Sequence, residues 1–369
     1  STNMNANEVI ANIALEAMGH EKGEYQYLHP NNDVNMAQST NDAYPTAIRV
    51  GLLLGHDFLL TSLDKLIQSF AAKGLEFGHV LKMGRTQLQD AVPMTLGQEF
   101  RAFATTLGED LQHLKRLAPL LLTEVNLGGT AIGTGINADP RYQQLAVERL
   151  AIISNHPVVP AADLIEATSD MGAFVLFSGM LKRTAVKLSK VCNDLRLLSS
   201  GPRTGINEIN LPARQPGSSI MPGKVNPVIP EAVNQVAFEV IGNDLALTLA
   251  AEAGQLQLNV MEPLIAYKIL DSIRLLTRAM DMLREHCIDG ITANEAHCRQ
   301  QVEQSIGLVT ALNPYIGYEN ATRIAKLALD SGRGVLELVR EEKLLDDASL
   351  ADILRPENMI APRLVPLKA

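Results

Sequence analysis

Four loops of the sequence are rich in hydroxyl, amide and glycine residues, which can bind carboxylate groups without adding negative charge. They span residues 38–42, 84–90, 126–131 and 201–226, and each lies next to a stretch with helical periodicity. Backbone N–H groups at helix N-termini also favour anions. One such loop is most simply a helix cap. Four of them beside four long helices indicate a neutral, donor-rich site for carboxylates.

The last of these loops ends in the most unusual pattern. Gly217 is followed by two small hydroxyl residues, Ser218 and Ser219, and Lys224 and Asn226 precede the next helix. Five residues separate the two glycines of this pattern and a Val follows the Lys. A phosphate-binding P-loop has four residues there and a Ser or Thr after the Lys. We therefore reject a nucleotide site for this loop.

Several other classes of site and partner do not fit the sequence. Residues 133–135 lack the strand-then-helix context of a dinucleotide-binding loop, and the eight His residues form no paired metal-ligand motif. The net charge is −9 without a basic block, which disfavours nucleic acids and anionic membranes as partners. No uncharged apolar stretch of about 18 residues predicts a membrane span.

The three cysteines, Cys192, Cys287 and Cys298, have no C-x-x-C spacing. A disulfide framework is therefore not expected, and a reducing compartment is indicated. We predict a cytoplasmic location.

The composition predicts a mainly α fold with an aliphatic core, because aromatic residues make up only 4% of the chain and Trp is absent. Helical periodicity and capping residues predict five long helices. They run from Pro45 to about Phe77, from about Leu96 to Leu122, from Thr168 to Ser199, from Pro230 to about Leu258, and from about Pro263 to His286.

The predicted helix 230–258 is largely apolar, with four acidic residues and no basic one. No Lys or Arg occurs between Val225 and Tyr267. A helix that is apolar around its whole circumference is buried on most sides. We expect a helical bundle that is shared between subunits.

At 369 residues the chain exceeds what one hydrophobic core usually serves. After residue 294 the predicted elements become shorter. We predict three parts: a remnant of an N-terminal domain at 1–40, a central helical bundle domain at 41–294, and a small C-terminal helical domain at 295–369.

The pattern of residues 217–226, GSSIMPGKVN, resembles the G-S-S-x-M-P-x-K-x-N signature of the fumarase/aspartase superfamily. Residues 38–42 and 84–93 resemble two further motifs of that superfamily, in the same order. The resemblance extends over essentially the whole chain and implies a long-helix bundle with a small C-terminal helical domain. It also implies that the N-terminal domain is largely missing, together with a substrate-contacting Thr ahead of Ser1 and therefore one wall of the site.

Within the superfamily, residues 38–45, 89–93 and 252–263 resemble the aspartase branch, and Gln87 stands where fumarases typically have His. The resemblance implies a carbon–nitrogen lyase that reversibly eliminates ammonia from L-aspartate to give fumarate. No cofactor is implied, although magnesium activates some members. Two alternatives stay open: a fumarate hydratase that acts on malate, and a structural member without turnover, as in lens crystallins.

The resemblance also implies a role for particular residues. Ser218 matches the general base that removes the β-proton of aspartate and so forms an enediolate intermediate, and Glu231 matches a carboxylate that would face Gln87. No metal ligand is implied. As partners the resemblance implies only the small-molecule substrate and further copies of the chain, in a homotetramer whose sites are each shared between three subunits. The matched substrate-binding positions are Ser39, Thr40, Asn41, Thr86, Gln87, Ser219, Lys224 and Asn226.

Overall fold

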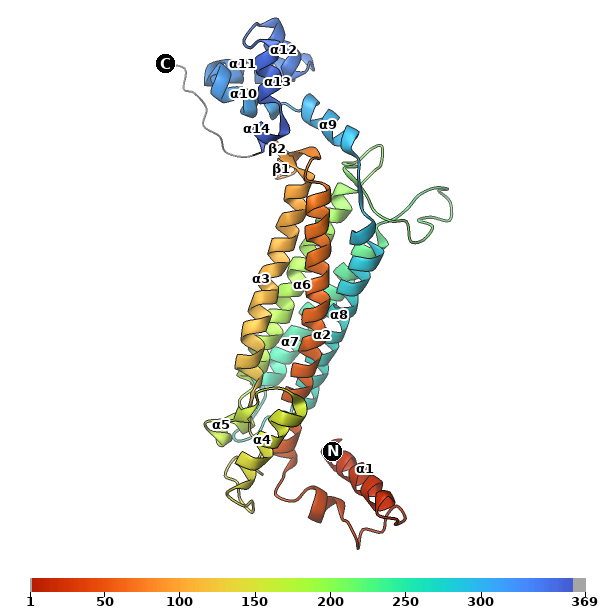
Figure 1. Ribbon diagram of the computed structural model, residues 1–369, viewed down its shortest axis with the longest axis vertical. Helices are drawn as coiled ribbons and strands as arrows, with labels where there is room; N and C mark the ends of the chain where they lie inside the picture. The colour runs from red at the N-terminus through yellow and green to blue at the C-terminus, as the bar shows by residue number, and fades with distance from the viewer. Residues whose placement is uncertain (1, 361–369) are drawn as a thin grey trace. The chain divides into compact units, whose positions relative to one another are not determined.

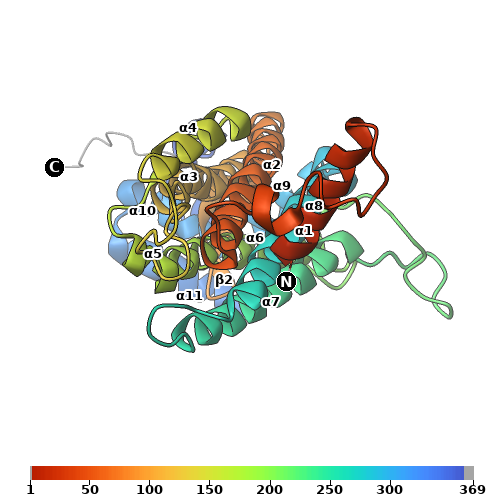
Figure 2. The same ribbon diagram turned by 90° about the horizontal axis from the view of Figure 1, so that it is seen from below.

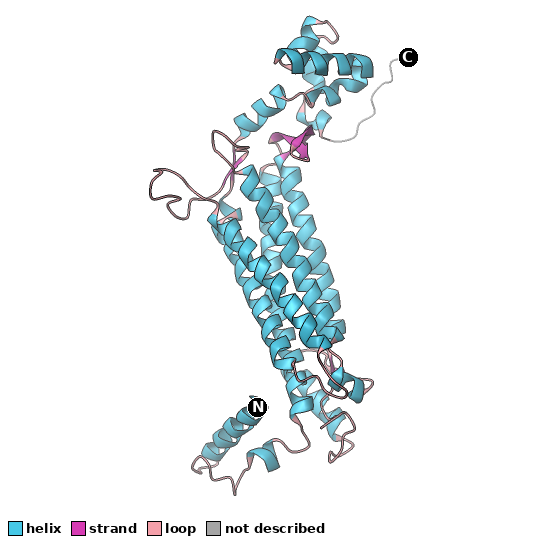
Figure 3. Ribbon diagram, turned by 180° about the vertical axis from the view of Figure 1, so that it is seen from behind, coloured by secondary structure: helices cyan, strands magenta, loops and turns pink. Residues whose placement is uncertain are grey.

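The computed structural model describes residues 2–360 and is mainly α, as predicted (Figures 1 and 3). The five long helices are α2 (Thr40–Glu76), α3 (Leu96–Leu122), α6 (Gly172–Leu198), α7 (Val228–Glu252) and α8 (Glu262–His286). The shorter ones before residue 295 are α1 (Thr2–Ala17), η1 (Pro30–Val34), α4 (Tyr142–Ser154), α5 (Leu164–Ser169) and η2 (Ile288–Gly290). The C-terminal helices are α9 (Glu295–Gln304), α10 (Leu308–Ile316), α11 (Tyr318–Ser331), α12 (Val335–Glu341), α13 (Asp347–Ile353) and α14 (Pro356–Met359).

Strands are few and short, and they pair two by two. Antiparallel pairs are β1 (Leu81–Thr86) with β2 (Gln89–Thr95) and β5 (Ile209–Asn210) with β6 (Thr292–Ala293). The parallel pair is β3 (Glu124–Val125) with β4 (Val159–Pro160).

Contacts within the chain define two compact units. Unit 1 contains the described residues up to Asp64 together with Glu109–Leu188 and Asn234–Met280, and unit 2 contains the rest. Each of the five long helices contributes one end to each unit. The units follow contacts rather than domain borders, so the predicted boundaries at 40 and 294 stay predictions.

Unit 1 is built around segments of the five long helices, which run side by side (Figures 1 and 2). Its core is largely aliphatic, as the composition predicts, with buried phenylalanines from α6. Each helix contributes a side chain that is almost completely buried: Leu52 from α2, Leu114 from α3, Phe177 from α6, Leu247 from α7 and Ile269 from α8.

Unit 2 contains the β1–β2 hairpin and helices α9–α14. Where α2 and α3 approach one another, a Cβ on Gly97 would lie 2.4 Å from the carbonyl oxygen of Gly74, so only glycine allows this contact. The predicted C-terminal helices share a buried cluster that includes Leu312, Ile324 and Leu338.

Helix α2 begins at Thr40, five residues before the predicted start, and Pro45 lies inside it. Proline cannot donate to the carbonyl four residues earlier, which here belongs to Asn41. The side chain of Asn126 donates to that oxygen instead, at 2.9 Å. This replacement contact allows the helix to start before the proline.

Two other helix ends differ from the prediction. The predicted helix from Thr168 is split, because Asp170 is extended and its carboxylate accepts the N–H of Gly172, where α6 begins. Helix α7 ends at Glu252, since the chain turns between Gln255 and Leu258. The predictions for α3 and α8 are confirmed to within one residue.

Helix α2 is long and apolar enough, by length and composition, to cross a membrane. Half of its most apolar window is buried within the protein, and the core helix of a soluble protein meets the same criteria. It contains Arg49 and His56, both nearly buried. All three cysteines are free, in agreement with the expectation of no disulfide framework, and all three are buried.

Candidate active site

The loop that carries Ser218 is closed on itself between β5 and α7. The N–H of Gly217 donates to the carbonyl oxygen of Lys224 at 2.8 Å, and the side-chain amide of Asn226 donates to the carbonyl oxygen of Gly217 at 2.9 Å. A Cβ on Gly217 would lie 2.5 Å from the Lys224 oxygen. Glycine is therefore required at the point where the loop closes, and the Asn226 amide helps to close it.

The Ser218 hydroxyl lies at the start of a tight turn within this loop. Its Oγ accepts hydrogen bonds from the backbone N–H groups of Ile220 and Met221, at 3.2 Å each. The side chain is half-buried. Two amide dipoles that point at one oxygen stabilise negative charge on that oxygen.

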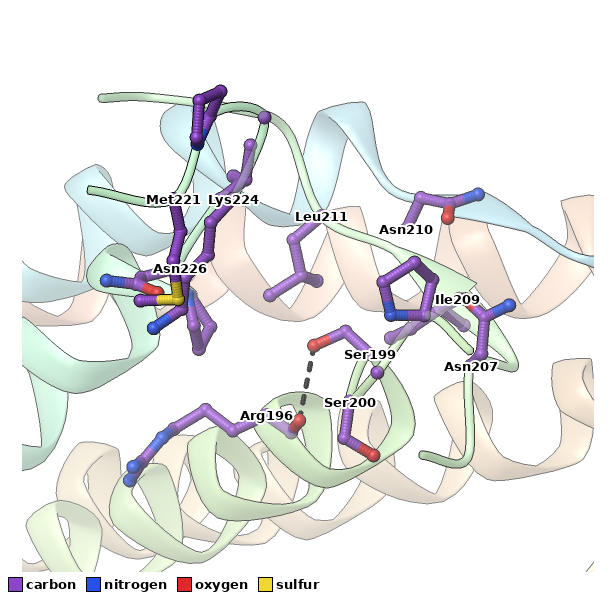
Figure 4. A pocket seen from close by; sticks show the side chains of 16 residues that line it. Arg196, Ser199, Ser200, Asn207, Ile209, Asn210, Leu211, Met221, Lys224 and Asn226 are labelled. Carbon is purple, nitrogen blue, oxygen red and sulfur yellow. Dashed lines mark hydrogen bonds between the residues drawn. The ribbon is translucent and has the colours of Figure 1, made fainter. Parts of the chain in front are cut away.

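A cavity of about 770 Å³ lies beside the loop (Figure 4). Lys224 and Asn226 line it from the loop, and Arg196 lines it from the last turn of α6. No Asp or Glu is among the described residues that line it. A cavity with two cationic side chains and no carboxylate suits an anionic ligand. Ser218 and Ser219 belong to the same loop but are not among the lining residues.

Three predicted residues lie at the start of α2, in unit 1. The Ser39 hydroxyl oxygen accepts the N–H of Asn41 at 3.2 Å, and the Thr40 hydroxyl donates to the side-chain oxygen of Asn3 at 2.9 Å. The Asn41 amide donates to the carbonyl oxygen of Ala131 at 2.7 Å. Thr40 and Asn41 are thus tied to other segments of the same unit, whereas Ser39 caps its own segment.

Asp42 anchors this segment and is completely buried. One carboxylate oxygen accepts the N–H of Ser39 at 2.9 Å, and the other accepts the N–H groups of Gly128 at 3.1 Å and Thr130 at 2.8 Å. Burial raises the pKa of Asp42, although the backbone donors oppose this shift. Asp42 therefore joins two of the polar loops seen in the sequence. The sequence contains a signal for the role of Asp42, because Ser39 and Asp42 have the spacing of a capping box.

Thr86 and Gln87 are exposed at the tip of the β1–β2 hairpin, in unit 2. Gln87 and Leu88 both have left-handed backbone conformations, with φ of 52° and 61°. Such angles suit a two-residue hairpin turn but are normally supplied by Gly or Asn. A non-glycine residue in this conformation is common at functional sites.

The other predicted positions in unit 2 are Ser218, Ser219, Lys224 and Asn226, of which Ser219 and Lys224 are exposed. Within the described part of unit 2, no hydrogen bond joins Thr86 or Gln87 to this loop. Within unit 2, the predicted site residues therefore form two groups, one at the hairpin tip and one in the Ser218 loop.

Glu231 forms an ion pair with Arg196, in which Oε1 and Nη2 are 3.8 Å apart. Sequence reasoning linked Glu231 with Gln87 and assigned no role to Arg196. The only sequence signal for Arg196 was a basic residue in the last turn of a helix. Among residues 2–360, no group of three His, Cys, Asp or Glu side chains is arranged to hold a metal ion.

Comparison with known proteins gives consistent matches. The Lyase family profile matches residues 1–242, and the profile of the fumarase C C-terminus matches residues 308–361. An aspartate ammonia-lyase from Pseudomonas fluorescens is 90% identical over 369 residues, which are 100% of this chain and 77% of that protein. An aspartate ammonia-lyase from Escherichia coli K12 is 59% identical over 98% of this chain and 76% of its own length.

Two solved structures share the fold. The fumarate lyase:delta crystallin from Brucella melitensis bound to cobalt has a TM-score of 0.94 and 61% identity, and the match covers 98% of this chain and 78% of that one. A class II fumarase from Schistosoma mansoni has a TM-score of 0.90 and 35% identity, with coverage of 97% and 78%.

Proposed function

The chain belongs to the aspartate ammonia-lyases of the fumarase/aspartase superfamily, and from this membership we infer that it converts L-aspartate into fumarate and ammonia. The observation that carries this function is the identity to curated aspartate ammonia-lyases along the whole chain. The class II fumarase with the same fold is only 35% identical, so elimination of ammonia is favoured over hydration of fumarate.

In the mechanism that we propose, Ser218 removes the β-proton of aspartate. This proton is weakly acidic, because its removal places a second negative charge on the neighbouring carboxylate. A free hydroxyl is also a poor base near neutral pH. The N–H groups of Ile220 and Met221, which already donate to Ser218 Oγ, support its deprotonated form.

The enediolate that results needs donors that are oriented before the reaction begins. Lys224 and Asn226 at the cavity wall support binding of one carboxylate. We assign Ser39, Thr40, Asn41, Thr86, Gln87 and Ser219 to the remaining contacts. Gln87 cannot donate a proton as an acid, so ammonia leaves without a strong general acid at that position. The mechanism uses no cofactor, and magnesium would act only as an activator.

The assignment of the base is tested by comparing Ser218→Ala with Ser219→Ala in an assay that follows fumarate by its absorbance. We expect Ser218→Ala to lower kcat by at least about 100-fold with unchanged melting temperature, the usual range for loss of acid–base catalysis. Ser219→Ala should lower kcat by a smaller factor. Near-normal turnover of Ser218→Ala would exclude Ser218 as the base. Assays with malate in place of aspartate test the alternative of a hydratase.

We also propose that the chain forms a homotetramer in which each site is shared between three subunits. An apolar stripe on α7 supports assembly, because Phe238, Leu245 and Leu249 are each more than 60% exposed. The predicted site residues of one chain also fall into separate motifs. If sites are shared, a mixture of the inactive variants Ser218→Ala and Thr86→Ala recovers activity after subunit exchange. A mixture that stays inactive although the subunits exchange would contradict shared sites.

We also propose a cytoplasmic location, which the free cysteines support.

A further inference from the structure

We propose that Arg196 is a second cationic substrate-binding residue, which holds one carboxylate of the diacid across the cavity from Lys224. The proposal rests on the proposed function, because it assumes that the cavity beside the Ser218 loop receives the substrate. None of the motifs in the sequence includes Arg196.

The position of Arg196 is the first observation. It lies in the last turn of α6, and its side chain is 41% exposed. Figure 4 shows it on the α6 side of the cavity, facing Met221, Lys224 and Asn226 of the loop. Arg196 and Lys224 therefore line one cavity from two different elements, helix α6 and the Ser218 loop.

The charge of the ligand is the second observation. Aspartate and fumarate each carry two carboxylates, and proton removal adds a further negative charge to one of them. Lys224 supplies one cation to the cavity, and Arg196 is the other cationic residue among its described lining residues. A guanidinium binds a carboxylate through two parallel hydrogen bonds, which fixes the orientation of the carboxylate as well as its position.

The ion pair with Glu231 does not prevent this role. The two groups are 3.8 Å apart, and both side chains are more than one third exposed. Solvent screens such a pair, so it contributes little to stability. A substrate carboxylate in the cavity can therefore replace Glu231 as the partner of the guanidinium at little cost.

A purely structural role makes a different prediction. A basic residue in the last turn of a helix is favoured by the helix dipole and by a nearby carboxylate. If Arg196 served only this purpose, removal of Arg196 or of Glu231 would change stability and leave ligand affinity unchanged. The two roles are therefore separated by a measurement of binding.

The experiment is calorimetric titration of the whole protein with succinate, a diacid that cannot react, followed by aspartate kinetics. We expect Arg196→Gln to weaken succinate binding by about 10- to 100-fold, since a charged hydrogen bond is lost, and to raise KM more than it lowers kcat. Glu231→Gln should bind succinate at least as tightly as the unaltered protein. Lys190→Gln is the matched control, because Lys190 is an exposed cation on the same helix outside the cavity.

Unchanged succinate affinity in a folded Arg196→Gln variant would overturn the proposal, and so would an equal loss of affinity in Glu231→Gln. If Arg196→Gln does not fold, Arg196→Lys decides. It keeps the charge but loses the planar fork, so we expect about tenfold weaker binding, and unchanged binding overturns the proposal. Absence of aspartate turnover in the unaltered protein would refute the proposed function instead, while the binding result still tests Arg196.

Discussion

Glu262 is a carboxylate at the start of α8 that lies almost entirely inside unit 1, with 5% of its surface exposed. Its Oε1 has no hydrogen-bond partner among the described residues. Burial raises the pKa of Glu262 to about 7 from an ordinary value of 4.5, and the charge of Arg49 opposes this shift only in part. The ionised form is therefore disfavoured in the folded protein.

We predict that Glu262→Gln stabilises the protein above pH 7 and has little effect below pH 4.5. Between these values the folded state holds a proton that the unfolded state has released, so the stability of the unaltered protein falls as the pH rises. The shift from 4.5 to about 7 corresponds to a gain of about 3 kcal/mol. Chemical denaturation of the variant and the unaltered protein at pH 5 and pH 8 measures this difference in the free energy of unfolding. An equal effect at both pH values would contradict the assigned pKa.

At the level of single residues, the sequence pointed to chemistry but not to contacts. The motif at 217–226 identified Ser218 and Lys224 because their types and spacing are unusual. It did not show that the Asn226 amide closes the loop, since that contact depends on the path of the backbone. Arg196 was missed because it lies outside the motif, and only the folded path of residues 196–227 places it at the same cavity as Lys224.

The β1–β2 hairpin is the element in which backbone conformation departs most clearly from local preference. Gln87 and Leu88 are both left-handed at its tip. Leu88 is exposed, so its side chain contributes little burial that could offset the strain.

We predict that Leu88→Gly stabilises the protein by about 0.5 to 1 kcal/mol, because glycine adopts this conformation without a steric penalty. Thermal unfolding measures the change. Gln89→Gly is the control, since Gln89 lies in β2 and glycine weakens a strand. If Leu88→Gly destabilises as much as Gln89→Gly, the turn is not strained.

The hairpin is also fixed by a buried charge network. Glu208 is completely buried and lies 2.7 Å from Lys82 Nζ and 2.5 Å from Arg85 Nη1, while Lys82 also pairs with Glu99. Arg85 directly precedes Thr86. The network therefore holds the predicted site residues at the hairpin tip to the segment that leads into β5.

We predict that Glu208→Gln lowers the free energy of unfolding by about 3 kcal/mol, because it leaves buried cations with less countercharge. The control is Glu295→Gln, whose exposed carboxylate pairs with His79 and should contribute at most about 1 kcal/mol. Urea denaturation of both variants measures the difference. Similar small effects in both would show that the buried network does not stabilise the fold.

Helix existence followed from periodicity, while helix ends depended on contacts from elsewhere in the chain. Helices α3 and α8 were predicted almost to the residue. At the start of α3 the border depends on contacts within four residues, because Thr95 and Gln98 bind each other's backbone N–H groups. The start of α2 was misplaced because Asn126, eighty-five residues away, satisfies the carbonyl that Pro45 leaves unpaired.

At the scale of the whole molecule, α7 combines buried and exposed apolar residues. Ala237, Val240 and Leu247 are buried within the chain, whereas Phe238, Leu245 and Leu249 are exposed. The absence of Lys and Arg along this helix was visible in the sequence. Which of its apolar side chains remain exposed in one chain was not, because that depends on how the neighbouring helices pack.

We predict that Leu245→Asp shifts the protein toward smaller assemblies, since a buried charge at a subunit interface is costly. Light scattering at several protein concentrations measures the assembly state. The matched control is Leu329→Asp on α11, where the leucine is similarly exposed. If Leu245→Asp assembles like the unaltered protein, the α7 stripe does not mediate association.

The turn at Ser218 has one more consequence, which follows from counting electron pairs on its oxygen. A neutral hydroxyl has two lone pairs, and the N–H groups of Ile220 and Met221 occupy both. The O–H bond must then point away from the turn. The alkoxide has a third lone pair in that same outward direction. Ser218 can therefore pass between its protonated and deprotonated states while both amide contacts persist, and proton transfer needs no rearrangement of the turn.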